Sequence, residues 1–314
     1  MDTDCAFEKP WKRCEHLIQM KGIAVITKYL VNRKINLLAV LSVAAALILA
    51  GCGGSTSAPA STPTTAGAST GTTAHATLKH MPNGMATVSL DPASQTLTVK
   101  ISLIGLAPSS KHPAHIHAGS CAKEGGPVVH PLQDVVADEH GVGTSTTVIQ
   151  NVKVPASGWY INVHNGPGLS PPEQFLPIVC SDLNLASLSS PPSSSLNVPL
   201  DTAPPSSANE TASGTAQLTL SGSTLTVKLT LSSLAPNSSH AAHIHSGSCE
   251  SQGTVVHPLS NVVADASGNA TVTTTINNVS SIPSSGWYVN VHYSTDLSTQ
   301  TGFNPIACGN VTSG

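Results

Sequence analysis

Short runs in which apolar and polar residues alternate make up most of the chain beyond residue 73. The first half contains LTVKISLIGL, GTSTTVIQNV and GWYINVH, and the second half contains LTVKLTLSSL, NATVTTTINNV and GWYVNVH. A period of two is typical of a strand with one buried face, and turn residues separate the runs. No segment of this region has a convincing helical period. The pattern predicts an all-β fold of antiparallel β-sandwiches or Greek-key barrels.

Two segments of the chain are copies of one another. HPAHIHAGSCAKEGGPVVHPL begins at His112, and HAAHIHSGSCESQGTVVHPL begins at His240. Equivalent residues later in each copy keep the same order, with one residue lost from the loop of the second copy. We therefore predict two tandem domains, a first repeat (residues 74–182) and a second repeat (residues 211–314), joined by a Ser/Pro-rich linker at residues 183–210.

The start of the chain is similar to a bacterial lipoprotein signal. Basic residues precede an apolar run that closes with LAGC, and the cysteine of this lipobox is Cys52. The resemblance implies a signal peptide over residues 1–51, lipidation of Cys52, and a Ser/Thr/Pro-rich tether over residues 52–73 on a membrane-anchored protein of the cell envelope. A retained transmembrane helix is the alternative. Met20 gives a more usual signal length than Met1.

The charge balance beyond Cys52 argues against a nucleic-acid partner. This part of the chain has six Lys, no Arg and twelve Asp or Glu, a net charge of about −6. Without a basic surface there is no field to attract phosphates. Charged residues form only 9% of the chain, so hydroxyl and amide groups must keep it soluble, as suits an exported protein.

Four cysteines remain after the N-terminal ones are set aside, an even number in an exported chain. We expect one disulfide within each repeat, Cys121 to Cys180 and Cys249 to Cys308. Each bridge would stabilise its domain by roughly 4 kcal/mol in the chain-entropy account. The alternative is that Cys121 and Cys249, which follow the histidines closely, are thiolate metal ligands.

Histidines recur at the same places in both repeats. On a strand His115 and His117 face the same side, and alternation in GWYINVH places His164 away from the apolar face. We predict that these residues converge under the loop that carries His130. Imidazole ligands favour copper, zinc or nickel, and four nitrogens suit a tetragonal Cu(II) ion. The predicted ligands, for one copper ion per domain, are His115, His117, His130 and His164, and His243, His245, His257 and His292.

Other polar residues near these motifs have simpler interpretations. Asp138 and Asp265 precede glycines in VVADEHG and VVADASG, which favours a hairpin turn over a metal ligand. Trp159 and Trp287 are predicted core residues. The remaining histidines of this region are interpreted as solvated polar residues, although His112 and His240 lie close enough to the predicted ligands to support them; these histidines are His75, His80, His112, His140 and His240.

An ordered set of these features resembles the copper/zinc superoxide dismutase superfamily. The His-x-His strand, the following cysteine, the GTVVHPL loop, the NVVADASG turn, the late histidine and the terminal IACG resemble that family, and the first repeat matches through equivalent residues. The resemblance implies a superoxide dismutase-like sandwich, copper ligation and superoxide as a candidate substrate. Only PLS stands between His257 and Asn261, so further zinc ligands are missing and zinc is doubtful. Pro177 and Pro305 occupy the positions of the family's active-site arginine.

The chain also resembles CHRD (chordin-type) domains, through AAHIH, the Gly-x-Val-Val loop and YVNVH. This resemblance implies a β-sandwich module of the cell envelope without assigned catalysis. The leading hypothesis is a surface lipoprotein with two copper-binding, superoxide dismutase-like domains and weak dismutation. The alternatives are copper capture without turnover and a non-catalytic envelope or adhesion module. No catalytic residue is assigned, and the sequence names no protein partner.

Overall fold

The structure is a computed structural model, which describes residues 71–154, 158–170, 172–184, 188, 195–202, 204 and 206–314. The signal peptide, the lipobox at Cys52 and almost all of the tether lie outside these residues. The described residues fall within one compact unit, Ala66–Gly314. The predicted all-β fold is confirmed. Helical turns in the described part of the chain are short, namely α2 (Pro172–Phe175), α3 (Gln300–Phe303) and the 3-10 turn η2 (Ala208–Thr211). No helix in this part is long and apolar enough to cross a membrane.

The first repeat forms two sheets around an apolar core. One has the order β11-β2-β3-β8-β7-β4 and the other has the order β10-β9-β5-β6. Buried side chains from both sheets make one cluster, which includes Val99, Ile116 and Ile161. The strands are β2 (Asn83–Asp91), β3 (Thr96–Ile104), β4 (Lys111–His112), β5 (Ala114–Ala118), β6 (Val128–Pro131), β7 (Val135–Ala137), β8 (Gly143–Ile149), β9 (Trp159–His164), β10 (Pro177–Leu183) and β11 (Ser195–Leu200).

The second repeat has equivalent strands in one continuous sheet, with the order β16-β15-β19-β20-β1-β12-β13-β18 and with β21 paired to β1. The small pair β14-β17 is the counterpart of β4-β7. The strands are β1 (Thr72–His80), β12 (Ser213–Ser221), β13 (Thr224–Ser232), β14 (Ser239–His240), β15 (Ala242–Gly247), β16 (Gln252–Pro258), β17 (Val262–Val263), β18 (Ala270–Asn277), β19 (Trp287–His292), β20 (Pro305–Asn310) and β21 (Thr312–Ser313).

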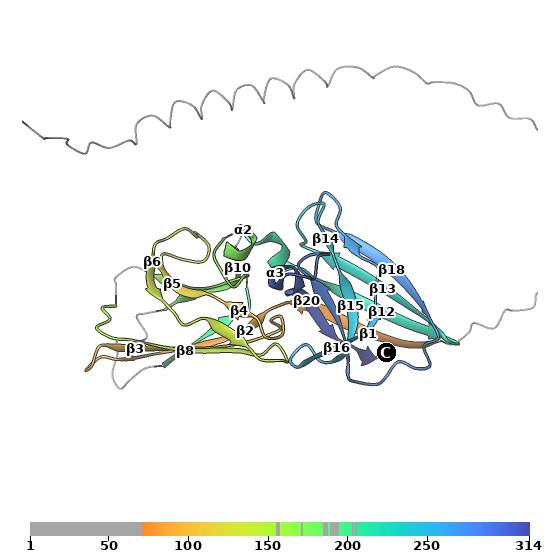
Figure 1. Ribbon diagram of the computed structural model, residues 1–314, viewed down its shortest axis with the longest axis horizontal. Helices are drawn as coiled ribbons and strands as arrows, with labels where there is room; N and C mark the ends of the chain where they lie inside the picture. Colours follow the sequence, from red (N-terminus) through yellow and green to blue (C-terminus); the bar gives the residue numbers. More distant parts are fainter. Residues whose placement is uncertain are drawn as a thin grey trace, which may run out of the picture. The chain divides into compact units, whose positions relative to one another are not determined.

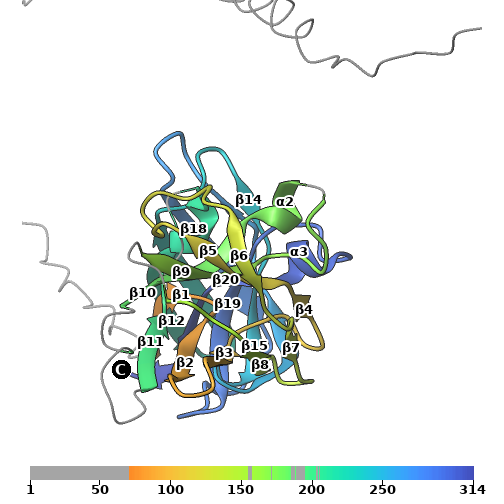
Figure 2. The same ribbon diagram turned by 90° about the vertical axis from the view of Figure 1, so that its left-hand side faces the viewer.

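The two repeats exchange their first strands. β1 lies at the start of the first repeat, yet it pairs antiparallel with β12 of the second repeat, from Thr72↔Leu220 to Leu78↔Gly214 (Figure 1). Conversely, β11 comes from the predicted linker and pairs with β2, from Ser195↔Ser89 to Leu200↔Gly84 (Figure 2). The sheets therefore do not follow the repeat boundaries in the sequence.

Burial explains why the exchanged strands stay in place. Ala74, Ala76 and Leu78 of β1 are buried in the core of the second repeat. Val198 and Leu200 of β11 are buried in the core of the first repeat. The Ser/Pro-rich composition of residues 183–210 concealed this strand, because only every second residue of SLNVPL is buried and a local pattern cannot identify the partner strand.

Leu78→Ala in β1 should loosen the second repeat rather than the first. Truncating a buried leucine costs about 2–5 kcal/mol. Hydrogen exchange followed by mass spectrometry should accelerate in β12 and β13. The matched variant Leu200→Ala in β11 should instead accelerate exchange in β2 and β3. Faster exchange mainly in β2 and β3 for Leu78→Ala would contradict the exchange of strands.

Candidate metal centre

Three histidines of each repeat come together on one face of a sheet. The antiparallel register of β5 and β9 sets His115 opposite Asn162 and His117 opposite Tyr160, so these side chains share a face. The His115 ring centroid lies 5.7 Å from that of His117 and 5.2 Å from that of His164. One ring nitrogen from each histidine lies within 4.8 Å of the others. The predicted convergence is therefore observed for these three residues.

The second repeat reproduces this arrangement on β15 and β19. The ring centroid of His243 lies 5.6 Å from that of His245 and 5.1 Å from that of His292. One ring nitrogen of each again lies within 4.8 Å of the others. We call these two sets of residues the first and second histidine clusters. In each cluster His115 or His243 is half-buried, while the other two members are buried, so the clusters are reached from the side of His115 and His243.

Hydrogen bonds to backbone carbonyl oxygens fix the orientation of the buried imidazole rings. Nδ1 of His117 lies 2.9 Å from the carbonyl oxygen of Gly126, and Nδ1 of His164 lies 2.5 Å from that of Phe175. A ring that donates from Nδ1 in its neutral form keeps an unprotonated Nε2. Such an outer hydrogen bond is typical of histidines that bind a metal. In the first repeat these contacts leave Nε2 of both rings free to bind an ion.

The second cluster has the same outer supports. Nδ1 of His245 lies 3.1 Å from the carbonyl oxygen of Gly253, and Nδ1 of His292 lies 2.6 Å from that of Phe303. Gly126 and Gly253 are needed for close approach, because an added Cβ would overlap the carbonyl oxygen of Ala118 or Ser246. The loop after β5 and the start of β16 can therefore approach β5 and β15 this closely only with glycine at these positions.

Burial favours the neutral imidazole at most of the cluster positions, among them His115, His164, His243 and His292. It lowers the pKa of His164 and of His292 to about 4, against the opposing effect of their carbonyl partners. Burial also lowers the pKa of His115 and of His243, and the neighbouring histidine on the same strand adds to that effect. A histidine must be neutral to offer a nitrogen lone pair, so at neutral pH these rings are in the ligand form.

Neither His130 nor His257 joins the clusters. His130 pairs with Ile116 across β5 and β6, and His257 pairs with Ile244 across β15 and β16. Directly paired residues share a face, so both histidines lie on the side of the apolar core, opposite to the clusters. Their rings pack edge-on against Trp159 and Trp287, with centroids 5.0 and 5.2 Å apart. Of the four histidines predicted in each repeat, the structure therefore brings three together and places His130 and His257 apart from them.

The disulfide prediction is confirmed, and the cysteines are therefore not thiolate ligands. Cys121 bonds to Cys180, and Cys249 bonds to Cys308. Cys180 pairs with Asn162 across β10 and β9, so each bridge lies on the same face as its histidine cluster. The bridges thus hold the sheet that carries the candidate ligands.

Both predicted turn aspartates accept hydrogen bonds within their own loops. Asp138 Oδ1 accepts from the backbone of His140 and Val142, and Asp265 Oδ1 accepts from that of Ser267 and Asn269. These aspartates stabilise turns, as predicted. Trp159 is buried in the core and Trp287 packs against the core, which confirms their prediction.

His112 and His240 are buried, not solvated as predicted. Nδ1 of His112 lies 2.8 Å from the carbonyl oxygen of His164, and Nδ1 of His240 lies 2.9 Å from that of His292. Both side chains are 0% exposed. Their Nε2 atoms accept from Ser110 and Ser238 at 2.8 and 2.7 Å. These histidines position the backbone of a candidate ligand, which is the supporting role that their closeness to the predicted ligands in the sequence allowed.

Tyrosines also support the clusters. The Tyr160 ring stacks on His117 with centroids 5.0 Å apart, and Tyr288 stacks on His245 at the same separation. Burial raises the pKa of Tyr288 to about 12, so its phenol is protonated at neutral pH. Alternation in GWYINVH places Tyr160 on the same face as His164. The stacking itself depends on the register with β5.

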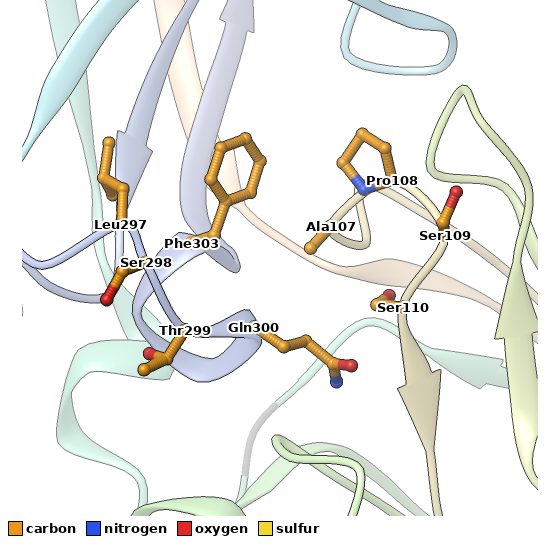
Figure 3. Close-up of a pocket in the computed structure, with 9 residues that line it drawn as sticks. All are labelled: Ala107, Pro108, Ser109, Ser110, Leu297, Ser298, Thr299, Gln300 and Phe303. Carbon is orange, nitrogen blue, oxygen red and sulfur yellow. The ribbon is translucent and has the colours of Figure 1, made fainter.

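A separate hollow of about 290 Å³ lies beside α3, lined by residues that include Ser109, Ser110, Thr299, Gln300 and Phe303 (Figure 3). Its lining has no ionisable side chain. It borders the second cluster only indirectly, through Phe303, whose carbonyl oxygen accepts from His292. Side chains capable of metal ligation are gathered at the histidine clusters, not in this hollow.

Comparison with known proteins identifies the repeated unit. The chain matches the CHRD domain family over residues 56–167 and 196–296, which together make up more than half of its length. A comparison with curated proteins finds no match. The first matched region includes the exchanged strand β1, and the second includes the exchanged strand β11 apart from Ser195. The chain therefore belongs to the CHRD domain family and carries two tandem copies of the domain.

Proposed function

We propose that this protein is a non-catalytic, two-domain CHRD module that captures one transition-metal ion in each domain. The observation that carries the proposal is the pair of three-histidine clusters, each with its ring nitrogens directed together. The membership of the CHRD family supports a binding module rather than an enzyme.

Ring nitrogens without hydrogen-bond partners fit a metal ion. In the first cluster these buried atoms are His115 Nδ1, His117 Nε2 and His164 Nε2. A buried polar atom without a partner is costly, so a cation that accepts these lone pairs would remove the cost. In the second cluster His245 Nε2 is likewise unpartnered, and His292 Nε2 lies 3.1 Å from His243 Nδ1. A bound ion would replace the proton that those two atoms share.

Copper is the ion that the donor atoms favour. Three neutral imidazoles suit copper, zinc and nickel better than magnesium or calcium, and among divalent ions of the first row Cu(II) binds most tightly. The four cysteines of the described residues are joined in disulfides, so they offer no thiolate ligand that would change this preference for copper.

Capture is favoured over superoxide turnover by the charge of the molecule. Fast turnover of an anion requires cationic groups that attract it to the metal. The chain has no arginine beyond Cys52, and Lys111 is paired with Asp134 at 2.7 Å. The half-buried His115 and His243 give an ion access without a positively charged guide.

The purified protein should bind two Cu(II) ions per chain, measured by elemental analysis and by Cu(II) electron paramagnetic resonance. His117→Ala with His245→Ala should remove most of this binding, because each substitution deletes one of three ligands. The matched control is His130→Ala with His257→Ala, on the opposite face of the same sheets, which should retain two ions. Equal binding by both double variants would refute the assigned clusters.

The copper-loaded protein should turn over superoxide far below the diffusional ceiling of about 10⁸–10⁹ M⁻¹s⁻¹. Added salt should leave the rate unchanged, because there is no steering field for ions to screen. Pulse radiolysis over a series of ionic strengths measures both quantities. A rate near the ceiling that falls steeply with salt would show that the protein is an enzyme, not a capture module.

We further propose that the module is tethered to the cell envelope through a lipid on Cys52. The lipobox supports this anchoring, and the two disulfides are typical of an oxidising compartment outside the cytoplasm. Cys52→Ser should abolish labelling by a fatty acid and release from the signal peptide, whereas Cys14→Ser should change neither. Persistent labelling of the Cys52→Ser variant would exclude this anchor.

A further inference from the structure

A buried asparagine lies beside each histidine cluster. Asn162 pairs with His115 on one side and with Cys180 on the other, and it stands between Tyr160 and His164 on β9. Asn290 pairs with His243 and with Cys308 in the second repeat. Because directly paired residues share a face, both asparagine side chains project on the face of the histidine clusters.

At least one amide atom of each asparagine is buried without a hydrogen-bond partner. Asn162 is 4% exposed and Asn290 is 1% exposed. The Oδ1 atom of Asn162, and both Oδ1 and Nδ2 of Asn290, are buried atoms with no hydrogen bond. Oδ1 of the buried Asn304 also has no hydrogen-bond partner, but its Nδ2 donates to the Asn165 carbonyl oxygen at 2.8 Å. The unpartnered amide atoms of Asn162 and Asn290 therefore lie on the same face of the sheet as the candidate metal ligands.

We propose that Asn162 and Asn290 each supply an amide oxygen as a fourth donor to the captured ion. This inference rests on the proposed function, because it completes the same sites. Three imidazole nitrogens and one amide oxygen form a neutral donor set. The asparagine takes the place that sequence reasoning gave to His130 and His257, which the register directs to the other face.

An oxygen donor gives the site a preference among oxidation states. Amide oxygen is a hard ligand, which suits a divalent ion and contributes little to a soft monovalent ion. The asparagines would thus favour Cu(II) over Cu(I). Replacing the amide with an apolar group should weaken binding of Cu(II) while leaving binding of Ag(I), a monovalent substitute for Cu(I), unchanged.

The experiment compares three double variants of the full chain by competitive titration with a chelator. Asn162→Leu with Asn290→Leu should weaken Cu(II) binding at least tenfold and leave Ag(I) binding unchanged. Asn162→Asp with Asn290→Asp should bind Cu(II) at least as tightly as the parent, because a carboxylate oxygen is a stronger donor. The matched control is Asn197→Leu with Asn277→Leu, which alters two exposed strand asparagines, one in each sandwich, and should have no effect.

A second measurement separates ligation from a merely structural role. The metal-free leucine variant should melt at the parent's temperature or a few degrees above it, because the substitution removes buried amides that have no partner. Electron paramagnetic resonance should still show three coordinated imidazoles, with altered copper hyperfine coupling.

The outcomes distinguish this inference from the proposed function. If the parent binds two Cu(II) ions and the leucine variant binds them equally well, the asparagines are not ligands and the three-histidine sites stand. If the parent binds no ion, both proposals fail. If the leucine variant does not fold, the aspartate variant decides, and a tenfold loss of Cu(II) affinity there would overturn the inference.

Discussion

The antiparallel register between β5 and β9, repeated between β15 and β19, is the constraint on which the candidate sites depend. Ile116 opposite Ile161 faces the core, and the same pairing sends His115 and Asn162 to the other side. A slip of one residue would turn the histidines toward the apolar core and the isoleucines toward the cluster face, so burial of the core enforces the geometry of the cluster. The same sheet thus carries core residues that stabilise the domain on one face and the candidate metal ligands on the other.

Hydrogen bonds to backbone groups around each cluster fix the orientation of its imidazole rings. Strand register alone leaves an imidazole free to rotate about its side-chain bonds. The carbonyls of Phe175 and Gly126 remove that freedom in the first repeat, since each accepts from the Nδ1 of one ring. Both acceptors lie in segments that follow the strands, a helical turn and a glycine loop. Rigid strands therefore supply the ligands, and the segments after them select the tautomer.

Sequence reasoning predicted those parts of the molecule that depend on local alternation or on spacing between copies. It placed His115, His117 and His164 on one face, paired the cysteines and assigned Asp138 to a turn. It misplaced His130, because the face of an edge-strand residue depends on a register with β5 that includes a bulge. It could not detect the exchange of β1 and β11, because partner choice is a long-range property. The unpartnered state of Asn290 emerges only when every neighbouring group is known.

The exchange of strands also makes each histidine cluster depend on chain from the other repeat. β1 pairs with β20 at Lys79↔Cys308, next to the position where Cys308 pairs with Asn290. Met81, directly after β1, packs with Tyr288 and the Cys249–Cys308 bridge. Tyr288 in turn stacks on His245, so a segment encoded at the start of the first repeat supports a ligand of the second. In the first repeat the backbone of Cys180 donates to Thr202, directly after β11, at 2.9 Å. A domain cut at the repeat boundary would keep its three histidines and lose the strand that steadies the sheet beneath them. The pair of CHRD domains, rather than either domain alone, is therefore the unit on which the geometry of the two sites rests.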